Sequence, residues 1–153
     1  MIPDQHKKKA AWVAVCVACV SGFEGLRQVA YNDPVGIPTV CFGETKGVKL
    51  GDRYTVDECK DMLADSLQIA AEAVDRCTRV PLTDARRAAL VSFAYNVGGG
   101  AYCGSTVARK LNQGDIQGGC DALLLWRKAQ GLTLPGLLIR REKERQLCLQ
   151  GVT

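Results

Sequence analysis

The stretch EGLRQVAYNDPVGIPTVCFG, residues 24–43, holds two carboxylates in unlike local settings. Glu24 stands at the end of an apolar run that predicts a helix. Asp33 begins the tetrapeptide DPVG, in which Asp, Pro and Gly occupy the positions they favour in a type I turn. Residues 38–42 then have the composition of a strand. The stretch therefore predicts a helix end, a tight turn and a strand, with a carboxylate at each of the first two.

Two carboxylates in different environments are what glycoside hydrolysis requires, because one must stay protonated and the other ionised. Glu24, flanked by Phe23 and Leu26, is the candidate acid, since apolar surroundings disfavour the charged form of a carboxyl. Asp33, on a polar turn, is the candidate ionised partner. On spacing alone a plainer interpretation is favoured, in which Glu24 is a solvated helix residue and Asp33 only forms a turn.

The pattern Glu-x8-Asp-x5-Thr, within Y-x-D-P-x-G-x-x-T, resembles the catalytic signature of the phage-type lysozymes. This is the endolysin family of T-even and lambdoid phages, glycoside hydrolase family 24. The likeness covers roughly residues 21–151 and depends on the shared order of several short motifs. These are Val80-Pro81-Leu82-Thr83, FAYNVG (93–98), Ser105-Thr106, Trp126, Gly136-Leu137, Arg140-Arg141-Glu142 and Leu147-Cys148. One departure is Cys41, where many relatives have Gly.

The resemblance implies an α+β, mainly α, lysozyme-like fold with two lobes. A small lobe would carry an antiparallel β-sheet, and a long helix would link it to a helical C-terminal lobe. Residues 24–153 would form the lysozyme domain, with the catalytic β lobe over about 24–58 and the helical lobe over 59–153. Residues 1–23 would be a basic and apolar export or signal-anchor segment, or the first helix of the fold.

The resemblance also implies the chemistry of a muramidase, a lysozyme of class EC 3.2.1.17. Such an endolysin hydrolyses the β-1,4 bond between N-acetylmuramic acid and N-acetylglucosamine in peptidoglycan and lyses the host cell, with inversion at the sugar carbon. Glu24 would be the general acid, Asp33 the ionised partner, and Thr39 would help to hold the attacking water. We expect no metal and no other cofactor.

Further residues of the site are carried over from the same resemblance. Tyr31 and Asn96 are expected to contact sugar. In the family an arginine of the last helix pairs with the catalytic Glu, and Arg140 and Arg141 are the two candidates. The run RREKER (140–145) that contains them is otherwise typical of a solvated helix face.

Three other functions stay open. A lytic transglycosylase would give 1,6-anhydro products, although it needs no water-holding Asp33 and Thr39. A non-catalytic wall-binding protein would keep the fold but would not need both carboxylates. A small membrane-bound structural protein would account for the N-terminus alone and not for the ordered motifs that follow it.

Composition limits the partners. The chain has 153 residues, 47% of them hydrophobic, and a formal charge of +4. This length forms one domain or two lobes with a proper core. The modest positive charge suits an anionic wall polymer, whereas the absence of a basic run interleaved with aromatic residues argues against nucleic acid. We expect a monomer.

The cysteines indicate export. Eight are present, an even number that is high for a cytosolic protein and typical of disulfides. The only histidine is His6, which argues against a zinc site. The sequence alone leaves the pairing open, but the resemblance implies three disulfides and leaves Cys16 and Cys19 over. The implied pairs are Cys41–Cys59, Cys77–Cys103 and Cys120–Cys148.

The N-terminus allows three interpretations. Three lysines (7–9) precede the apolar run AAWVAVCVACV (10–20), the pattern of a signal sequence. The segment could be the first buried helix, a weakly hydrophobic signal-anchor as in some endolysins of the resembling family, or a cleaved signal peptide. The second is favoured. It implies export to the host periplasm, transient inner-membrane association, and an enzyme that becomes active on release.

Helix boundaries follow from capping residues. Thr55 and Glu58 form a capping box ahead of a helix to about Arg76. Later helices are expected to start at Thr83 or Asp84, after Ser105, after Asp115 and at Pro135. The glycines at 98–100 are expected to break the chain, and the helix after Asp115 to end near Gly131.

Overall fold

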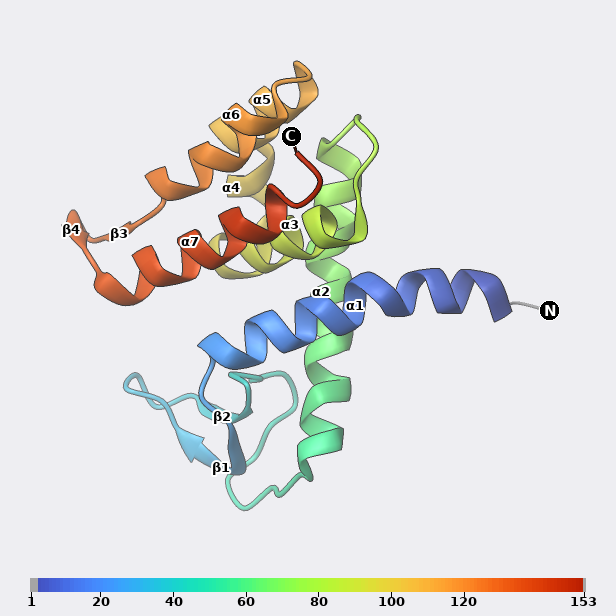
Figure 1. Cartoon of the computed structure of the whole chain (residues 1–153). Helices are drawn as coiled ribbons and strands as arrows, with labels where there is room; N and C mark the ends of the chain where they lie inside the picture. Colours follow the sequence, from blue (N-terminus) through green and yellow to red (C-terminus); the bar gives the residue numbers. More distant parts are fainter. Residues whose placement is uncertain (1–2, 153) are drawn as a thin grey trace. The chain divides into compact units, whose positions relative to one another are not determined.

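The computed structural model describes residues 3–152, with side chains from residue 11 onward (Figure 1). Its helices and two antiparallel strand pairs confirm the α+β, mainly α class. The first two residues of the expected N-terminal segment lie outside the described part. The elements are α1 (Pro3–Phe23), β1 (Arg27–Asn32), β2 (Pro38–Cys41), α2 (Val56–Cys77), α3 (Asp84–Val97), α4 (Gly99–Cys103), α5 (Thr106–Asn112), α6 (Ile116–Asp121), a 3-10 helix (Ala122–Leu125), β3 (Lys128–Ala129), β4 (Leu132–Thr133) and α7 (Pro135–Cys148).

The chain divides into two compact units, in keeping with a two-lobed fold. The sheet unit is Val17–Ser66. The helical unit is the chain up to Cys16 together with the chain from Leu67 onward. Helix α2 begins in the sheet unit and ends in the helical unit.

In the sheet unit, β1 and β2 form an antiparallel hairpin. Tyr31 is paired with Thr39 and Asn32 with Pro38, and the register shifts between Arg27 and Tyr31. The disulfide Cys41–Cys59 joins the end of β2 to the first turns of α2. Cys41 has φ 62°, a left-handed conformation that favours glycine.

Side-chain caps start the helices where the sequence predicts them. Thr55 and Glu58 form the reciprocal capping box, with N–H···O distances of 3.0 and 3.1 Å. The side chains of Thr83, Ser105 and Asp115 each accept a backbone N–H of the following helix. Each such cap stabilises its helix by about 1 kcal/mol. The predicted starts of α2, α3, α5 and α6 are thereby confirmed. Helix α7 also begins where predicted, at Pro135, but without a side-chain cap.

The core of the helical unit forms around α3, which packs beside α7 (Figure 1). Phe93 makes edge-to-face contacts with Trp126 and Tyr102, at centroid distances of 5.4 and 6.2 Å. Two disulfides, Cys77–Cys103 and Cys120–Cys148, close loops in this unit. Together with Cys41–Cys59 they are the three pairs that the resemblance implies, and each closure is worth about 3–4 kcal/mol on the chain-entropy model.

The helix expected to reach Gly131 is shorter than predicted. Helix α6 ends at Asp121, a 3-10 turn follows, and β3 and β4 then form a two-residue hairpin. Its turn residues Gln130 and Gly131 have φ 52° and 80°. Two consecutive positive φ values suit a hairpin turn and cannot continue a helix.

The glycine run also differs in part from its prediction. Gly98 ends α3 with φ 94°, as expected of a helix break. Gly99 and Gly100, however, begin the short helix α4. A Cβ on Gly99 would lie 2.7 Å from the Cβ of Ala73, so this position needs glycine because another helix passes close to it.

Helix α1 buries Trp12, Cys16 and Val20 along one side. The thiol of Cys16 donates to the backbone carbonyl of Ala88 at 3.4 Å, and both Cys16 and Cys19 lie outside the three disulfides. Over residues 3–152, no helix combines the length and the apolar character needed to span a membrane.

Candidate active site

The β1–β2 turn fixes the carboxylate of Asp33. Its Oδ1 accepts the backbone N–H groups of Val35 and Ile37 at 2.9 and 2.8 Å. The backbone of Asp33 is bonded as well, to the carbonyl of Ile37 and the N–H of Gly36, both at 2.9 Å. Gly36 adopts φ 83°, which the turn requires. Both side-chain bonds go to Oδ1, and Oδ2 takes no hydrogen bond from the described residues.

Thr39 lies on the other strand of the same hairpin and is 5% exposed. Its hydroxyl donates to the backbone carbonyl of Ile37 at 2.9 Å. A hydroxyl has one proton, so while this bond persists Thr39 Oγ1 can only accept further hydrogen bonds.

Tyr31 is the cross-strand partner of Thr39, so both side chains lie on one face of the hairpin. The guanidinium carbon of Arg27 lies 4.2 Å from the centroid of the Tyr31 ring, a cation–π contact that orients the ring. One hairpin therefore brings together three of the residues that the sequence singled out: Tyr31, Asp33 and Thr39.

Glu24 directly follows α1 in the sheet unit. Its backbone N–H donates to the carbonyl of Val20 at 3.0 Å, which extends the last turn of the helix by one residue. The side chain is half-buried. The predicted position of Glu24, at the exit of an apolar helix shortly before the hairpin, is confirmed.

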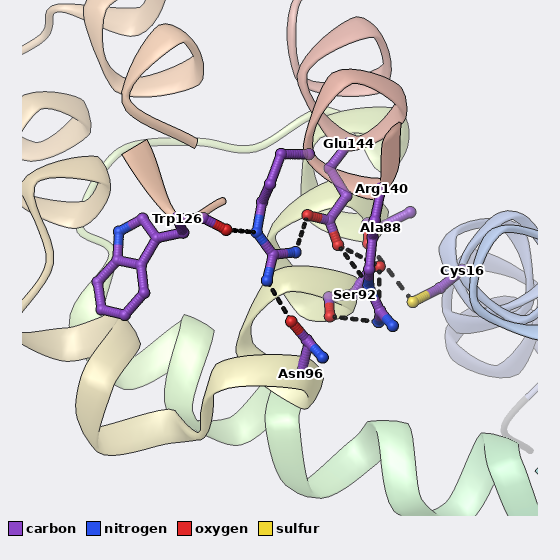
Figure 2. Close-up of polar contacts among 8 residues, drawn as sticks. Cys16, Ala88, Ser92, Asn96, Trp126, Arg140 and Glu144 are labelled. Atoms are coloured by element: carbon purple, nitrogen blue, oxygen red, sulfur yellow. Dashed lines mark hydrogen bonds and ion pairs between the residues drawn. The ribbon is translucent and has the colours of Figure 1, made fainter. Parts of the chain in front are cut away.

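The other predicted residues, Asn96, Arg140 and Arg141, belong to the helical unit, where the two arginines lie in a buried cluster around Glu144 (Figure 2). Glu144 Oε1 accepts from Arg141 Nη1 at 2.6 Å. Its Oε2 accepts from Ser92 Oγ at 2.6 Å and from Arg140 Nε at 3.3 Å. Arg140 Nη2 also donates to the backbone carbonyl of Ser92 at 3.1 Å.

Arg141 is engaged through all three of its nitrogens. Besides Glu144, it donates from Nε to the carbonyl of Trp126 at 2.9 Å and from Nη2 to Asn96 Oδ1. Its guanidinium carbon lies 5.0 Å from the ring centroid of Phe93. Burial lowers the pKa of Arg141, and the neighbouring Glu144 carboxylate opposes that shift.

The cluster corrects the expectation of a solvated face for residues 140–145. Arg140, Arg141 and Glu144 are all buried, because α3 supplies polar partners at Ser92 and Asn96. Sequence reasoning missed Glu144 and Ser92. The spacing of Glu144, three and four residues after the two arginines, was a signal, since such pairs meet on one side of a helix. Nothing in the sequence pointed to Ser92.

Asn96 is exposed, with its Oδ1 held by Arg141. Its amide Nδ2 is therefore the group that can donate to a ligand. Among the side chains of residues 11–152, no group of three or more His, Cys, Asp or Glu is placed to hold a metal ion.

The chain is similar to several known proteins. The family model described as phage lysozyme matches residues 21–144. A protein named SAR-endolysin from Enterobacteria phage PA-2 is 41% identical over 163 residues, which covers 99% of each chain. Among solved structures, the muramidase domain of SpmX from Asticaccaulis excentricus has a TM-score of 0.82 and 33% identity, covering 88% of this chain and 95% of its own. A P22 lysozyme mutant has a TM-score of 0.82 and 37% identity, covering 88% and 94%.

Proposed function

The chain belongs to the phage lysozyme family, and on this premise we propose that Glu24, Asp33 and Thr39 carry out its reaction. The protein is an endolysin, a lysozyme-type hydrolase that acts on peptidoglycan and lyses the host cell. The specific reaction is hydrolysis of the β-1,4 bond between N-acetylmuramic acid and N-acetylglucosamine, the activity of EC 3.2.1.17. The observation that carries the assignment is the hairpin on which an oriented Asp33 carboxylate and the Thr39 hydroxyl occur together.

Glu24 is the general acid. It gives its proton to the glycosidic oxygen of the leaving sugar while positive charge develops at the sugar carbon. An arginine near this carboxyl would hold it in place. Arg140 and Arg141, both on the last helix, are the two candidates for that pairing.

Asp33 and Thr39 bind the attacking water. Thr39 Oγ1 can only accept, and so can an ionised Asp33 carboxylate. A water that donates one proton to each of them points its lone pair elsewhere, toward the sugar carbon. Asp33 takes the proton as the bond forms. This arrangement gives inversion, for which the carboxyl groups of Glu24 and Asp33 would lie roughly 6.5–9.5 Å apart when sugar is bound.

Two residues contact sugar in this proposal. Tyr31, whose ring is held by Arg27, packs against a sugar ring. Asn96 donates from Nδ2 to a hydroxyl or acetamido oxygen, because its Oδ1 is occupied.

Residues 1–23 deliver the enzyme to its substrate. We extend to this chain the signal-anchor-release mode that the name of its relatives describes. The segment associates transiently with the inner membrane during export and then leaves it, and Pro3–Phe23 forms α1 of a periplasmic monomer. While it is associated with the membrane, Glu24 is held at the membrane face and cannot act with Asp33, so release activates the enzyme.

Digestion of purified Gram-negative peptidoglycan tests the reaction. The expected products are fragments with new reducing ends at muramic acid, by mass spectrometry, and an α-anomer that appears first by NMR. Anhydro sugars would identify a transglycosylase instead, and a β-anomer appearing first would refute inversion. Absence of any digestion would contradict the enzymatic function.

A further inference from the structure

A cationic pocket of about 590 Å³ lies in the helical unit, where α2 ends and α5 begins. Three of its lining residues are arginines and none is acidic. None belongs to the proposed catalytic or sugar-binding set. The lining residues are Arg76, Cys77, Arg79, Cys103, Gly104, Ser105, Arg109, Asn112 and Gln113.

The three arginines carry charge that the described residues do not neutralise. Arg76, Arg79 and Arg109 are exposed, and none of them forms an ion pair with a described residue. The nearest acids in sequence have other partners, since Asp75 pairs with Arg87 and Asp115 with Lys110. Three like charges around one hollow repel one another, and an anion that enters relieves this repulsion.

The wall of the pocket is fixed, so the arginines extend from a rigid base. The Cys77–Cys103 disulfide ties the end of α2 to the end of α4. The side chain of Asn112 accepts from the backbone N–H of Arg79 at 2.8 Å and donates to the carbonyl of Cys77 at 2.9 Å. The segment that carries Arg76 and Arg79 is thus held to α5.

The chemistry of the lining selects the ligand. Guanidinium groups match carboxylates in a two-pronged geometry, and a pocket of this volume admits part of a polymer rather than a single ion. None of the lining residues is among the exposed large apolar side chains, which a membrane-binding surface would need. The lining therefore favours a hydrated, carboxylate-bearing polymer over a lipid surface.

We propose that this pocket binds the carboxylates of the peptide stems of peptidoglycan. It would be a wall-binding site that keeps the enzyme on its polymer between cleavages. The proposal rests on the proposed function for the identity of the polymer, but it concerns binding alone.

The test is a sedimentation assay with insoluble sacculi in the Glu24→Gln background, which leaves the polymer intact. The pocket variant is Arg76→Gln/Arg79→Gln/Arg109→Gln. The matched control, with the same change in net charge, replaces three exposed lysines of the sheet unit: Lys46→Gln/Lys49→Gln/Lys60→Gln. The probes are intact sacculi, sacculi whose stem carboxylates are converted to amides with a water-soluble carbodiimide and ammonia, and sedimentable phosphatidylglycerol vesicles.

We expect the pocket variant to bind intact sacculi about tenfold more weakly than its parent, because each exposed ion pair contributes a fraction of a factor of ten. The lysine control should lose much less, and the pocket variant should bind the amidated sacculi as its parent does. Equal losses in both triple variants, or a loss that persists on amidated sacculi, would overturn the proposal. So would a loss confined to the vesicles. Failure of the wild type to cleave would refute the reaction and leave this binding result intact.

Discussion

Replacing Glu144 by Gln should lower the free energy of unfolding by about 3 kcal/mol or more. The carboxylate is fully buried and faces two buried guanidinium groups, those of Arg140 and Arg141. Removing one partner of a buried ion pair typically costs about 3–5 kcal/mol, because the other charge is left uncompensated. Gln keeps one acceptor oxygen for Ser92 or Arg141, which places the estimate at the lower end of that range.

Urea denaturation followed by circular dichroism measures this change. The matched control is Glu142→Gln on the exposed side of the same helix, which should stay within about 0.5 kcal/mol of wild type. Adding Arg140→Met to Glu144→Gln should restore part of the lost stability, since it removes one of the two uncompensated charges. A loss below about 1 kcal/mol for Glu144→Gln would refute the view that this carboxylate neutralises the cluster.

Three further predictions concern the sheet unit and the disulfides. Burial raises the pKa of Glu44 above its ordinary 4.5, against the hydrogen bond from Ser66 and with help from Asp65. The stability that protonated Glu44 contributes is therefore full below pH 4.5 and is lost as the pH rises through the raised pKa. Between pH 4 and 7, Glu44→Gln should thus become more stable relative to the wild type. A difference in unfolding free energy between the two proteins that does not change with pH would contradict this. Thr39→Val should lower the rate of peptidoglycan hydrolysis at least about tenfold, because it removes one hydrogen bond to the attacking water, and Thr39→Ser should lower it much less. Equal rates for the two variants would exclude the water-holding role. Dithiothreitol should lower the melting temperature markedly, because each of the three disulfides contributes about 3–4 kcal/mol, and an unchanged melting curve would argue against that contribution.

Local features of the fold could be predicted from the sequence. The Thr55–Glu58 capping box, the caps at Ser105 and Asp115, and the turn at Asp33 depend on hydrogen bonds within four residues. The residue types and their spacing determine such bonds almost alone. The carboxylate pattern at Glu24 likewise lies within one short segment.

Features set by distant residues could not be predicted. The run at 140–145 has the charge pattern of a solvated helix, and only the approach of Ser92 and Asn96 makes part of it a buried network. Gly99 lies in a run of three glycines that predicts a helix break, yet the reason for glycine at this position is its close contact with Ala73. The cationic pocket unites arginines that are up to 33 positions apart in the chain, which no local motif reveals.

The most direct test of the catalytic assignment is the rate at which new reducing ends appear in purified peptidoglycan with the wild type, Glu24→Gln and Asp33→Asn. Asp61→Asn, an exposed carboxylate change on α2, is the control. A general acid or base contributes typically 10²–10⁴-fold, so each catalytic variant should fall by about a thousandfold while Asp61→Asn keeps the wild-type rate. A Glu24→Gln variant that cleaves at nearly the wild-type rate would contradict the assignment and locate the acid elsewhere in the chain.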